Sequence, residues 1–588
     1  MSYIIGIDLG TTNCALAYTA ANAPDPLHLP PVELFAVPQL VNPGEVRDED
    51  LLPSFLYLPG PNDFPPGSLA LPWPGKATHI VGQLAQKRGA ENVGRLVSSA
   101  KSWLSYSGID RTAALLPVAA PDGVSKISPL AASKAYLEHL RFSWNERKPD
   151  AVFSKQSVLI TVPASFDASA RELTQQAAEQ AGYTNVILLE EPQAAFYAWL
   201  ERHPDWRERV KVGDLILVVD IGGGTTDFTL IAVKEEGGEL QLERIAVGEH
   251  ILLGGDNMDL ALARTVEAHL AAKNTKLDTM QLNGLWQQCR IAKEKLLEPG
   301  NKQAESPVTI LGRGTGLVGG TIKGKVTRED LERVFLDGFF PKCGRDEMPQ
   351  VRKRAGLQEI GLPYAAEAAV TRHLAKFLAQ QPQRPTHVLF NGGVLRASII
   401  RNRILETLSS WQEKAVVPLE GEDLMHAVAR GAAYYGLARQ GKGVRIRGGI
   451  SRAYYVGIES SMPAIPGMPA PMKALTVAPF GMEEGTKAEI PQREFALVVG
   501  EPAEFRFLCS ATRHKDIPGE MIEQIGDDIE EITPMEVELS ADKDAGQFVR
   551  VTLGSEVTET GVLQLWCVAK DGRRWKLEFN VREKVAAA

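Results

Sequence analysis

Two similar turns, each with an aspartate at the end of an apolar run, contain the residues of this chain best suited to chemistry. The first lies at residues 5–13 (IGIDLGTTN) and the second at residues 218–227 (VVDIGGGTTD). Glycines let backbone N–H groups approach a polyphosphate, and threonine hydroxyls add donors. Asp8 and Asp220 suit a hydrated Mg²⁺, which one or two carboxylates and the nucleotide phosphates usually hold. One copy alone would also suit an ordinary strand connection, but two copies predict two similar lobes facing one nucleotide.

A third turn follows at residues 387–396 (HVLFNGGVLR), where another apolar strand runs into two glycines. The order of the three turns resembles that of the actin-like ATPase superfamily, which includes actins, sugar kinases and DnaK-type chaperones. Within it, six motifs resemble the DnaK-type 70-kDa heat-shock chaperone family, and they lie at residues 7–13, 81–83, 100–101, 161–166, 191–195 and 220–227. The resemblance covers about residues 3–440.

This resemblance implies a multi-domain fold: an actin-like α/β nucleotide-binding domain of two ribonuclease-H-like lobes at 1–442, a linker at 443–449, and a β-sandwich, substrate-binding-like domain at 450–588. The length of 588 residues also exceeds what one core fills. Alternating segments such as 495–499 and 562–568 independently predict an all-β domain after residue 443. Family members usually continue into a helical lid, so the resemblance implies a short form without one.

The resemblance also assigns roles to the motif residues. Its catalytic set is Lys101, Glu191, Asp220, Thr225 and Asp227. Lys101 would place the attacking water, and Asp227 would accept its proton. Asp8, Glu191 and Asp220 would hold Mg²⁺ through water. The implied nucleotide-binding set is Gly10, Thr11, Thr12, Asn13, Gly222, Gly223, Gly224, Thr225, Gly255, Lys293, Gly392, Gly393 and Arg396. The implied cofactors are ATP or ADP with Mg²⁺, and the resemblance also allows K⁺.

Three positions depart from the family pattern on the nucleoside side. Arg290 replaces a carboxylate, Leu297 a hydroxyl and Met425 an aspartate. Each lost hydrogen bond is worth roughly 0.5–1.5 kcal/mol, so two would weaken nucleotide binding by about ten- to a hundredfold. We therefore expect lower nucleotide affinity than is usual in the family, or different contacts.

Communication between domains is a second point of comparison. Pro163 and Arg171 match the family's allosteric relay. The linker is basic and contains only two large aliphatic residues, Val444 and Ile446, where the family has an acidic, leucine-rich segment. Ile187 and Glu190 stand where arginine and asparagine are usual on the surface that receives J-domain partners. The resemblance therefore implies unfolded or extended polypeptides as partners, while J-domain and nucleotide-exchange co-chaperones stay open.

Composition limits the remaining function classes. Charged residues make up 23% of the chain, the net charge is −9, and both signs are interspersed, which argues against nucleic-acid and anionic-membrane partners. The N-terminus has no basic or long apolar leader, and the five cysteines lack metal-ligand spacing, so we expect a cytoplasmic protein with reduced thiols.

Two further segments stand out in the sequence. The charged segment 201–211 is expected to be exposed to solvent. Residues 344–381 form an insertion with no assigned function.

Two glycine-rich patterns offer competing sites. Residues 314–319 fit a dinucleotide fingerprint, but strand-like residues follow them where that fingerprint needs a helix. Residues 319–325 fit most of a P-loop, but Val326 stands where a P-loop has serine or threonine. Both patterns therefore favour a glycine-rich hairpin.

The favoured function is ATP hydrolysis that controls binding of polypeptide. A nucleotide-sensing scaffold with little turnover is the alternative, and a small-molecule kinase of the same superfamily is a third.

Overall fold

The computed structural model describes residues 2–580 except for 23–28, 76–77, 107, 119, 167, 237–238, 250, 299, 312–320, 351–361, 363, 422, 445, 447–449, 451, 460–471, 483–484, 511–512, 514, 527, 532–534, 539–546 and 559–561. The chain divides into two units. The first comprises Met1–Leu242 and Val247–Arg445, and the second Glu243–Ala246 and Ile446–Ala588. The division after Arg445 falls inside the predicted linker, part of which lies outside the described residues.

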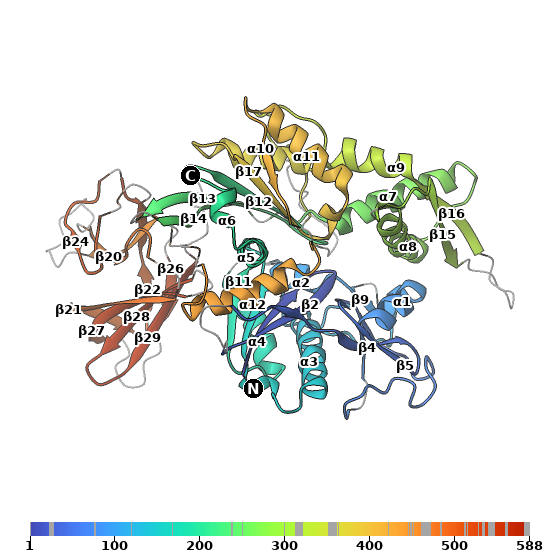
Figure 1. Ribbon diagram of the computed structural model, residues 1–588. Coiled ribbons are helices and arrows are strands. Elements are labelled where there is room, and N and C mark those ends of the chain that lie inside the picture. Colours follow the sequence, from blue (N-terminus) through green and yellow to red (C-terminus); the bar gives the residue numbers. More distant parts are fainter. Residues whose placement is uncertain are drawn as a thin grey trace. The chain divides into compact units, whose positions relative to one another are not determined.

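Two sheets organise the first unit (Figure 1), and their strand orders correspond when the second is read in reverse. The first has the order β11-β10-β1-β2-β3, and β6 also pairs with β2. Its strands are β1 (Tyr3–Leu9), β2 (Asn13–Ala20), β3 (Glu33–Leu34), β6 (Leu52–Pro53), β10 (Ser157–Val162) and β11 (Val186–Glu190). The second has the order β14-β13-β12-β17-β18. Its strands are β12 (Leu215–Ile221), β13 (Thr226–Glu236), β14 (Glu239–Val247), β17 (His387–Asn391) and β18 (Val417–Leu419).

The two sheets also share strand directions at their centres. β1 pairs antiparallel with β2 and parallel with β10, and β12 pairs antiparallel with β13 and parallel with β17. Each central strand is apolar and buried for most of its length, as expected for a strand covered on both faces. The carboxyl ends of β1 and β12 carry the two predicted turns, so the fold repeats the element that positions them.

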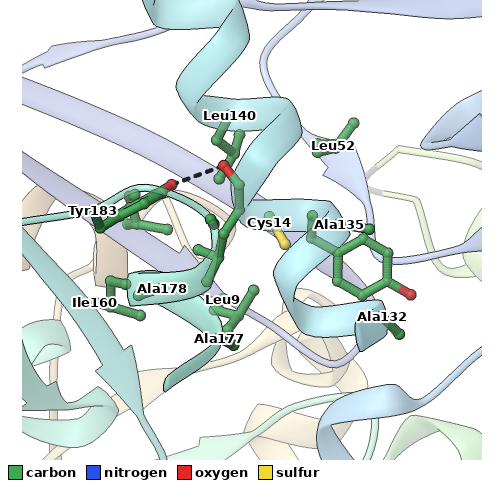
Figure 2. Close-up of a cluster of buried hydrophobic side chains, with 14 of the residues drawn as sticks. Leu9, Cys14, Leu52, Ala132, Ala135, Leu140, Ile160, Ala177, Ala178 and Tyr183 are labelled. Atoms are coloured by element: carbon green, nitrogen blue, oxygen red, sulfur yellow. Dashed lines mark hydrogen bonds between the residues drawn. The ribbon is translucent and has the colours of Figure 1, made fainter. Parts of the chain in front are cut away.

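Helices from distant parts of the sequence cover the first sheet. α3 (Pro129–Arg147), α4 (Ala168–Gln180), α5 (Glu191–Arg202) and α12 (Ala427–Arg439) belong to this layer. α3 begins at Ser128, whose hydroxyl accepts from the Ala131 N–H at 3.0 Å, and Pro129 occupies its first turn. Figure 2 shows Leu9, Cys14 and Ile160 of the sheet among residues of α3 and α4. There the Tyr183 hydroxyl donates to the Leu137 carbonyl at 2.9 Å.

Longer helices and a hairpin follow β14. They comprise α7 (Gly255–Ala271), α8 (Thr279–Leu297), β15 (Glu305–Leu311), β16 (Thr321–Thr327), α9 (Arg328–Glu332) and the π-helix Arg333–Phe339. α9 begins with the capping spacing Thr327-x-x-Asp330, in which the Thr327 hydroxyl accepts from the Asp330 N–H at 3.0 Å. β15 and β16 confirm the strand pair, whereas the glycines of 314–319 lie outside the described residues.

Two segments, 201–211 and 344–381, contain helices that the sequence did not predict. The segment 201–211 is not simply solvated, because it contains α6 (Trp206–Arg209) and both Trp206 and Val210 are buried. Trp206 and Val210 are large and apolar, and their burial outweighs the charged neighbours. The insertion 344–381 includes α10 (Val370–Ala379), in which Phe377 stacks on Phe228 of β13 with ring centroids 5.8 Å apart. Its residues 351–361 and 363 lie outside the described part.

The second unit consists of strands in all its described elements. One sheet has the order β24-β20-β19-β23-β25 and another β21-β27-β28-β29, while β22 pairs with β26. The bounds are β19 (Ala453–Glu459), β20 (Met472–Ala478), β21 (Thr486–Val499), β22 (Pro502–Phe505), β23 (Phe507–Ser510), β24 (Met521–Ile522), β25 (Glu530–Glu531), β26 (Met535–Glu538), β27 (Gln547–Val557), β28 (Val562–Ala569) and β29 (Arg574–Asn580). Side chains of both larger sheets, such as Leu475 and Leu565, share one core.

All five cysteines are buried and unpaired, as the sequence predicts. Burial raises the pKa of the Cys14 thiol to about 12, so this thiol stays protonated at neutral pH. No helix among the described residues is both long and apolar enough to span a membrane.

Candidate functional site

The three predicted turns surround one cavity of about 310 Å³ in the first unit. This volume is at the lower end of the usual range for ligand sites. The predicted residues that line it are Asp8, Gly10, Thr11, Thr12, Asn13, Lys101, Glu191, Asp220, Gly222, Gly223, Thr225, Gly255, Lys293, Gly392, Gly393 and Arg396. Gly224 and Asp227 do not line it, and Asp227 is buried behind it.

The first and second turns touch each other directly. A Cβ added to Gly223 would collide with the Thr12 hydroxyl, so a larger residue there would force the Thr12 side chain to move. The second turn is also tied to the start of α7, since the Gly255 N–H donates to the Gly222 carbonyl at 3.0 Å and the Asp256 N–H to the Gly223 carbonyl at 2.7 Å. The third turn needs glycine as well, because Gly392 has φ 92° and an added Cβ would meet the Ile221 carbonyl.

Asp8 and Asp220 occupy equivalent places in the two sheets. Asp8 lies opposite Thr161 in the parallel pair β1–β10, and Asp220 lies opposite Asn391 in the pair β12–β17. The Asn391 amide donates to Asp220 Oδ2 at 2.8 Å, while the Thr161 hydroxyl lies 3.5 Å from Asp8 Oδ1. The sheet duplication therefore presents two carboxylates, each with a polar neighbour on the adjacent strand.

Lys101 and Glu191 form an ion pair at the starts of two helices. Lys101 belongs to α2 (Ala100–Ser105), Glu191 is the first residue of α5, and the Lys101 ammonium donates to Glu191 Oε1. Both side chains are largely buried. Burial alone lowers the pKa of Lys101, but the Glu191 and Asp8 carboxylates raise it overall, so the ammonium stays charged.

The buried carboxylates are short of positive charge. Burial, followed by repulsion from Glu191, raises the pKa of Asp8 to about 7, and the same two causes raise that of Asp220. Burial likewise raises the pKa of Glu191. A divalent cation would relieve this repulsion, so the donor set fits Mg²⁺. Among the described residues no three His, Cys, Asp or Glu side chains lie close enough to ligate a metal directly.

Asp227 connects to the cavity through its neighbours. The Ser165 hydroxyl donates to Asp227 Oδ1 at 2.6 Å. Burial raises the pKa of Asp227, while hydrogen bonds from Ser165 and from Thr225 act in the opposite sense. Because Thr225 lines the cavity, it links Asp227 to the space where a phosphate would lie.

The side of the cavity lined by α8, where the nucleoside is expected, is built around a network of ion pairs. Arg290 of α8 is buried and donates to Asp256 at 2.5 Å and to Asp259 at 3.0 Å, both on α7. Lys293 pairs with Asp259 at 2.8 Å. Leu297 and Met425 line the same side, together with Glu294, Glu298, Phe335 and Ile400. The guanidinium is therefore held by two protein carboxylates.

Comparisons with known proteins point to one family. Residues 115–347 match the family model described as "Hsp70 protein". The chain is 36% identical over 161 residues to a protein named "Chaperone protein HscA homolog" of Methylibium petroleiphilum, covering 27% of this chain and 23% of that protein. It is 28% identical over 442 residues to the protein of the same name from Bordetella pertussis, covering 71% of this chain and 61% of the relative. Part of this chain is therefore similar to Hsp70-type proteins.

A third relative agrees in name and extent. The "Chaperone protein HscA homolog" of Burkholderia lata is 28% identical over 440 residues, covering 71% of this chain and 61% of its own length. The matched part thus spans less than two thirds of the length of each of these Hsp70-type relatives.

The predicted relay residues are connected to the site by a buried ion pair. Arg171 of α4 donates to the Phe166 and Ala164 carbonyls and to Glu190 Oε1, each at 3.0 Å. Pro163 directly follows β10 and precedes Ala164, and Glu190 directly precedes Glu191. Glu190 is 3% exposed, so the expectation that it shapes a partner-binding surface is wrong: its carboxylate is engaged by Arg171.

Sequence reasoning did not single out several polar residues of the site. Asn391, Ser165, Asp256 and Asp259 have no role among the predicted site residues, yet they contact Asp220, Asp227 and Arg290. Asp256 and Asp259 follow Gly255 with a spacing of three, which places both on one face of a helix. Arg290 and Lys293 have the same spacing on the next helix, α8. The two matching pairs of opposite charge could have indicated the ion-pair network between α7 and α8. Asn391 stands where the third strand ends, and Ser165 lies inside a matched motif.

Proposed function

We propose that this chain is an ATP-dependent, chaperone-like protein with an actin-like nucleotide-binding domain of two lobes, which hydrolyses ATP slowly to control binding of unfolded or extended polypeptide. The observation that carries the proposal is the cavity where β1 and β12 end, because it brings Asp8 and Asp220 together with the Lys101–Glu191 pair. The repeated strand order supports the two-lobed interpretation. The relatives' names support a chaperone role.

The phosphate end has the groups that phosphoryl transfer to water requires. Backbone N–H groups of the two turns and the Thr11 and Thr12 hydroxyls would bind the phosphate oxygens. Lys101, kept charged and held by Glu191, would place the attacking water, and Thr225 with Asp227 would take its proton. Asp8, Glu191 and Asp220 would hold Mg²⁺ through water. When bound, the ion neutralises charge on the phosphates.

The nucleoside would lie toward α8. Gly255, Lys293, Gly392, Gly393 and Arg396 line that side and are proposed to contact it. Lys293 already pairs with Asp259, so its contact with a nucleotide would compete with that pair. This competition supports the expectation of modest nucleotide affinity.

The second unit is proposed to be a β-sandwich that binds extended polypeptide through main-chain bonds and side-chain pockets. Pro163 and Arg171 would pass the nucleotide state onward, because Arg171 contacts Glu190, the neighbour of Glu191. J-domain and nucleotide-exchange proteins are proposed as further partners. The buried, unpaired cysteines support a reducing compartment, which we propose is the cytoplasm.

Single-turnover ATP hydrolysis by the intact chain tests the proposal. Radiolabelled ATP is mixed with excess protein, with and without an unfolded apolar peptide, in Mg²⁺ and in EDTA. We expect slow, Mg²⁺-dependent hydrolysis whose rate changes with peptide. Tight nucleotide binding without turnover, unaffected by peptide, would favour the nucleotide-sensing scaffold. The absence of both binding and turnover would refute the proposal.

A further inference from the structure

Helix α2, which carries Lys101, begins with an unusual backbone conformation. Ser99, the residue directly before α2, has φ 53° and ψ 31°, which lies in the left-handed region. Among the described residues other than glycine, only Asn274 shares a positive φ. Holding such a residue in this region costs free energy, and residues of this kind cluster at functional sites. Because Ser99 lies two positions before Lys101, its backbone sets how α2 presents the lysine.

The Ser99 hydroxyl is bonded across the first unit. Its Oγ donates to Asp256 Oδ2 at 2.6 Å, and Asp256 lies in the first turn of α7. α2 belongs to the half of the unit built on the first sheet, because Ala100, Trp103 and Leu104 lie in the core of that sheet. α7 belongs to the half that holds the second turn, since it follows β14 and packs on α8. The bond therefore ties the start of α2 to the second half.

Asp256 is itself fixed by three further bonds. Its N–H donates to the Gly223 carbonyl at 2.7 Å, and its carbonyl accepts from Trp286 Nε1 at 3.1 Å. Its Oδ1 accepts from Arg290 at 2.5 Å. Asp256 is 2% exposed, so water does not compete for its carboxylate. The acceptor that holds Ser99 is thus rigid, and Gly223 connects it to the second turn.

A second contact places α2 against the same turn. A Cβ added to Gly224 would collide with Ser102 Oγ and would lie 3.1 Å from the Thr11 side chain. Ser102 belongs to the first turn of α2 and is 2% exposed. The start of α2 therefore packs directly on the backbone of the second turn, at the point where the first turn also meets it.

We propose that Ser99 is a positioning residue for ATP hydrolysis, whose bond to Asp256 sets the start of α2 and thereby the place of the Lys101 ammonium. The inference rests on the proposed function, in which Lys101 places the attacking water. Glu191 holds the ammonium from the first half, whereas Ser99 holds the helix that carries it against the second half. Correct placement of the lysine therefore requires both halves of the unit.

Two substitutions at Ser99 separate the hydroxyl from the backbone conformation. Ser99→Gly adopts a positive φ without strain and loses the bond to Asp256. Ser99→Asn also tolerates this region, and its amide N–H groups can donate to a carboxylate. Asn274→Gly is the matched control, because Asn274 also has a positive φ but is exposed and does not line the cavity. Single-turnover ATP hydrolysis, ADP affinity in Mg²⁺ by calorimetry and thermal melting are measured for the parent and the three variants.

We expect Ser99→Gly to hydrolyse ATP about ten- to a hundredfold more slowly and to bind ADP within about twofold of the parent, because a misplaced group slows the reaction without weakening binding. Its melting temperature should not fall, since glycine relieves the backbone strain. Ser99→Asn should recover most of the rate, and Asn274→Gly should match the parent.

The positioning role would be overturned if Ser99→Gly hydrolysed ATP at the parent's rate or lost ADP affinity in proportion to its rate. It would also be overturned if Ser99→Asn were no faster than Ser99→Gly. A parent protein that binds no nucleotide, or that binds ATP without hydrolysing it, would instead overturn the proposed function itself.

Discussion

The two ends of the cavity are built from the same kinds of charged residues but use them differently. At the phosphate end, Asp8 and Asp220 are buried with raised pKa values, and the Lys101 ammonium, which lowers the pKa of Asp8, does not offset burial. At the nucleoside end, the carboxylates Asp256 and Asp259 are matched by Arg290 and Lys293. The carboxylates of the phosphate end therefore fit a bound cation, while those of the nucleoside end belong to a structural ion-pair network.

This difference explains why the sequence departs from the family pattern at one end only. Arg290 cannot serve as a hydrogen-bond acceptor for a ribose, and its donors already bind two carboxylates. Leu297 offers packing but no hydrogen bond. Recognition of a nucleotide is thus expected to depend chiefly on its phosphates and metal. The following predictions test that contrast.

The largest expected effect is on stability at the nucleoside end. Arg290→Met should lower the free energy of unfolding of the first unit by about 3–5 kcal/mol, because it leaves Asp256 and Asp259 buried with less compensation. Urea unfolding followed by fluorescence measures this. Lys325→Met is the matched control: Lys325 pairs with Glu305 on the surface, and its loss should cost less than about 1 kcal/mol.

Similar small losses in both variants would show that the Arg290 network is not structural. Unchanged stability with weaker nucleotide binding in Arg290→Met would make Arg290 a nucleotide contact and remove the contrast between the two ends.

The largest effect on catalysis is expected at the phosphate end. Lys101→Ala should slow single-turnover ATP hydrolysis by about two to three orders of magnitude and spare Mg²⁺-ATP binding, since one preorganised contact to the transition state is lost. Lys342→Ala is the control, because Lys342 pairs with Glu406 at an exposed position. Equal rates for Lys101→Ala and the parent would remove Lys101 from the mechanism.

The smallest effect should follow from adding a contact for the nucleoside. Leu297→Ser provides a hydroxyl beside the cavity and should tighten ADP binding by about two- to tenfold, the value of a single neutral hydrogen bond. Ile291→Ser, on the exposed side of the same helix, is the control and should change nothing. Weaker binding by Leu297→Ser would mean that Leu297 packs on the nucleoside and that apolar contact matters more there.

The sequence by itself determined the elements of this protein that are local. The apolar runs that end in Asp8 and Asp220 became β1 and β12, and Thr327 capped a helix as its spacing indicates. These features depend on residues a few positions apart, where periodicity and capping chemistry decide. The alternating segments after residue 443 likewise became strands.

Only the tertiary structure decided which distant residues meet. Asp256 and Arg290 are 34 positions apart, and Ser165 and Asp227 are 62 apart, so their pairing depends on how helices and sheets pack. The same is true of Glu190, which the sequence suggested was on the surface and which Arg171 holds in the interior. Trp206 is likewise buried although it lies in a charged segment that we expected to be exposed. The free energy gained by burying one large apolar side chain outweighs the solvation of its charged neighbours. Local pattern fixed the strands and turns, and three-dimensional packing fixed the partners of the buried charges.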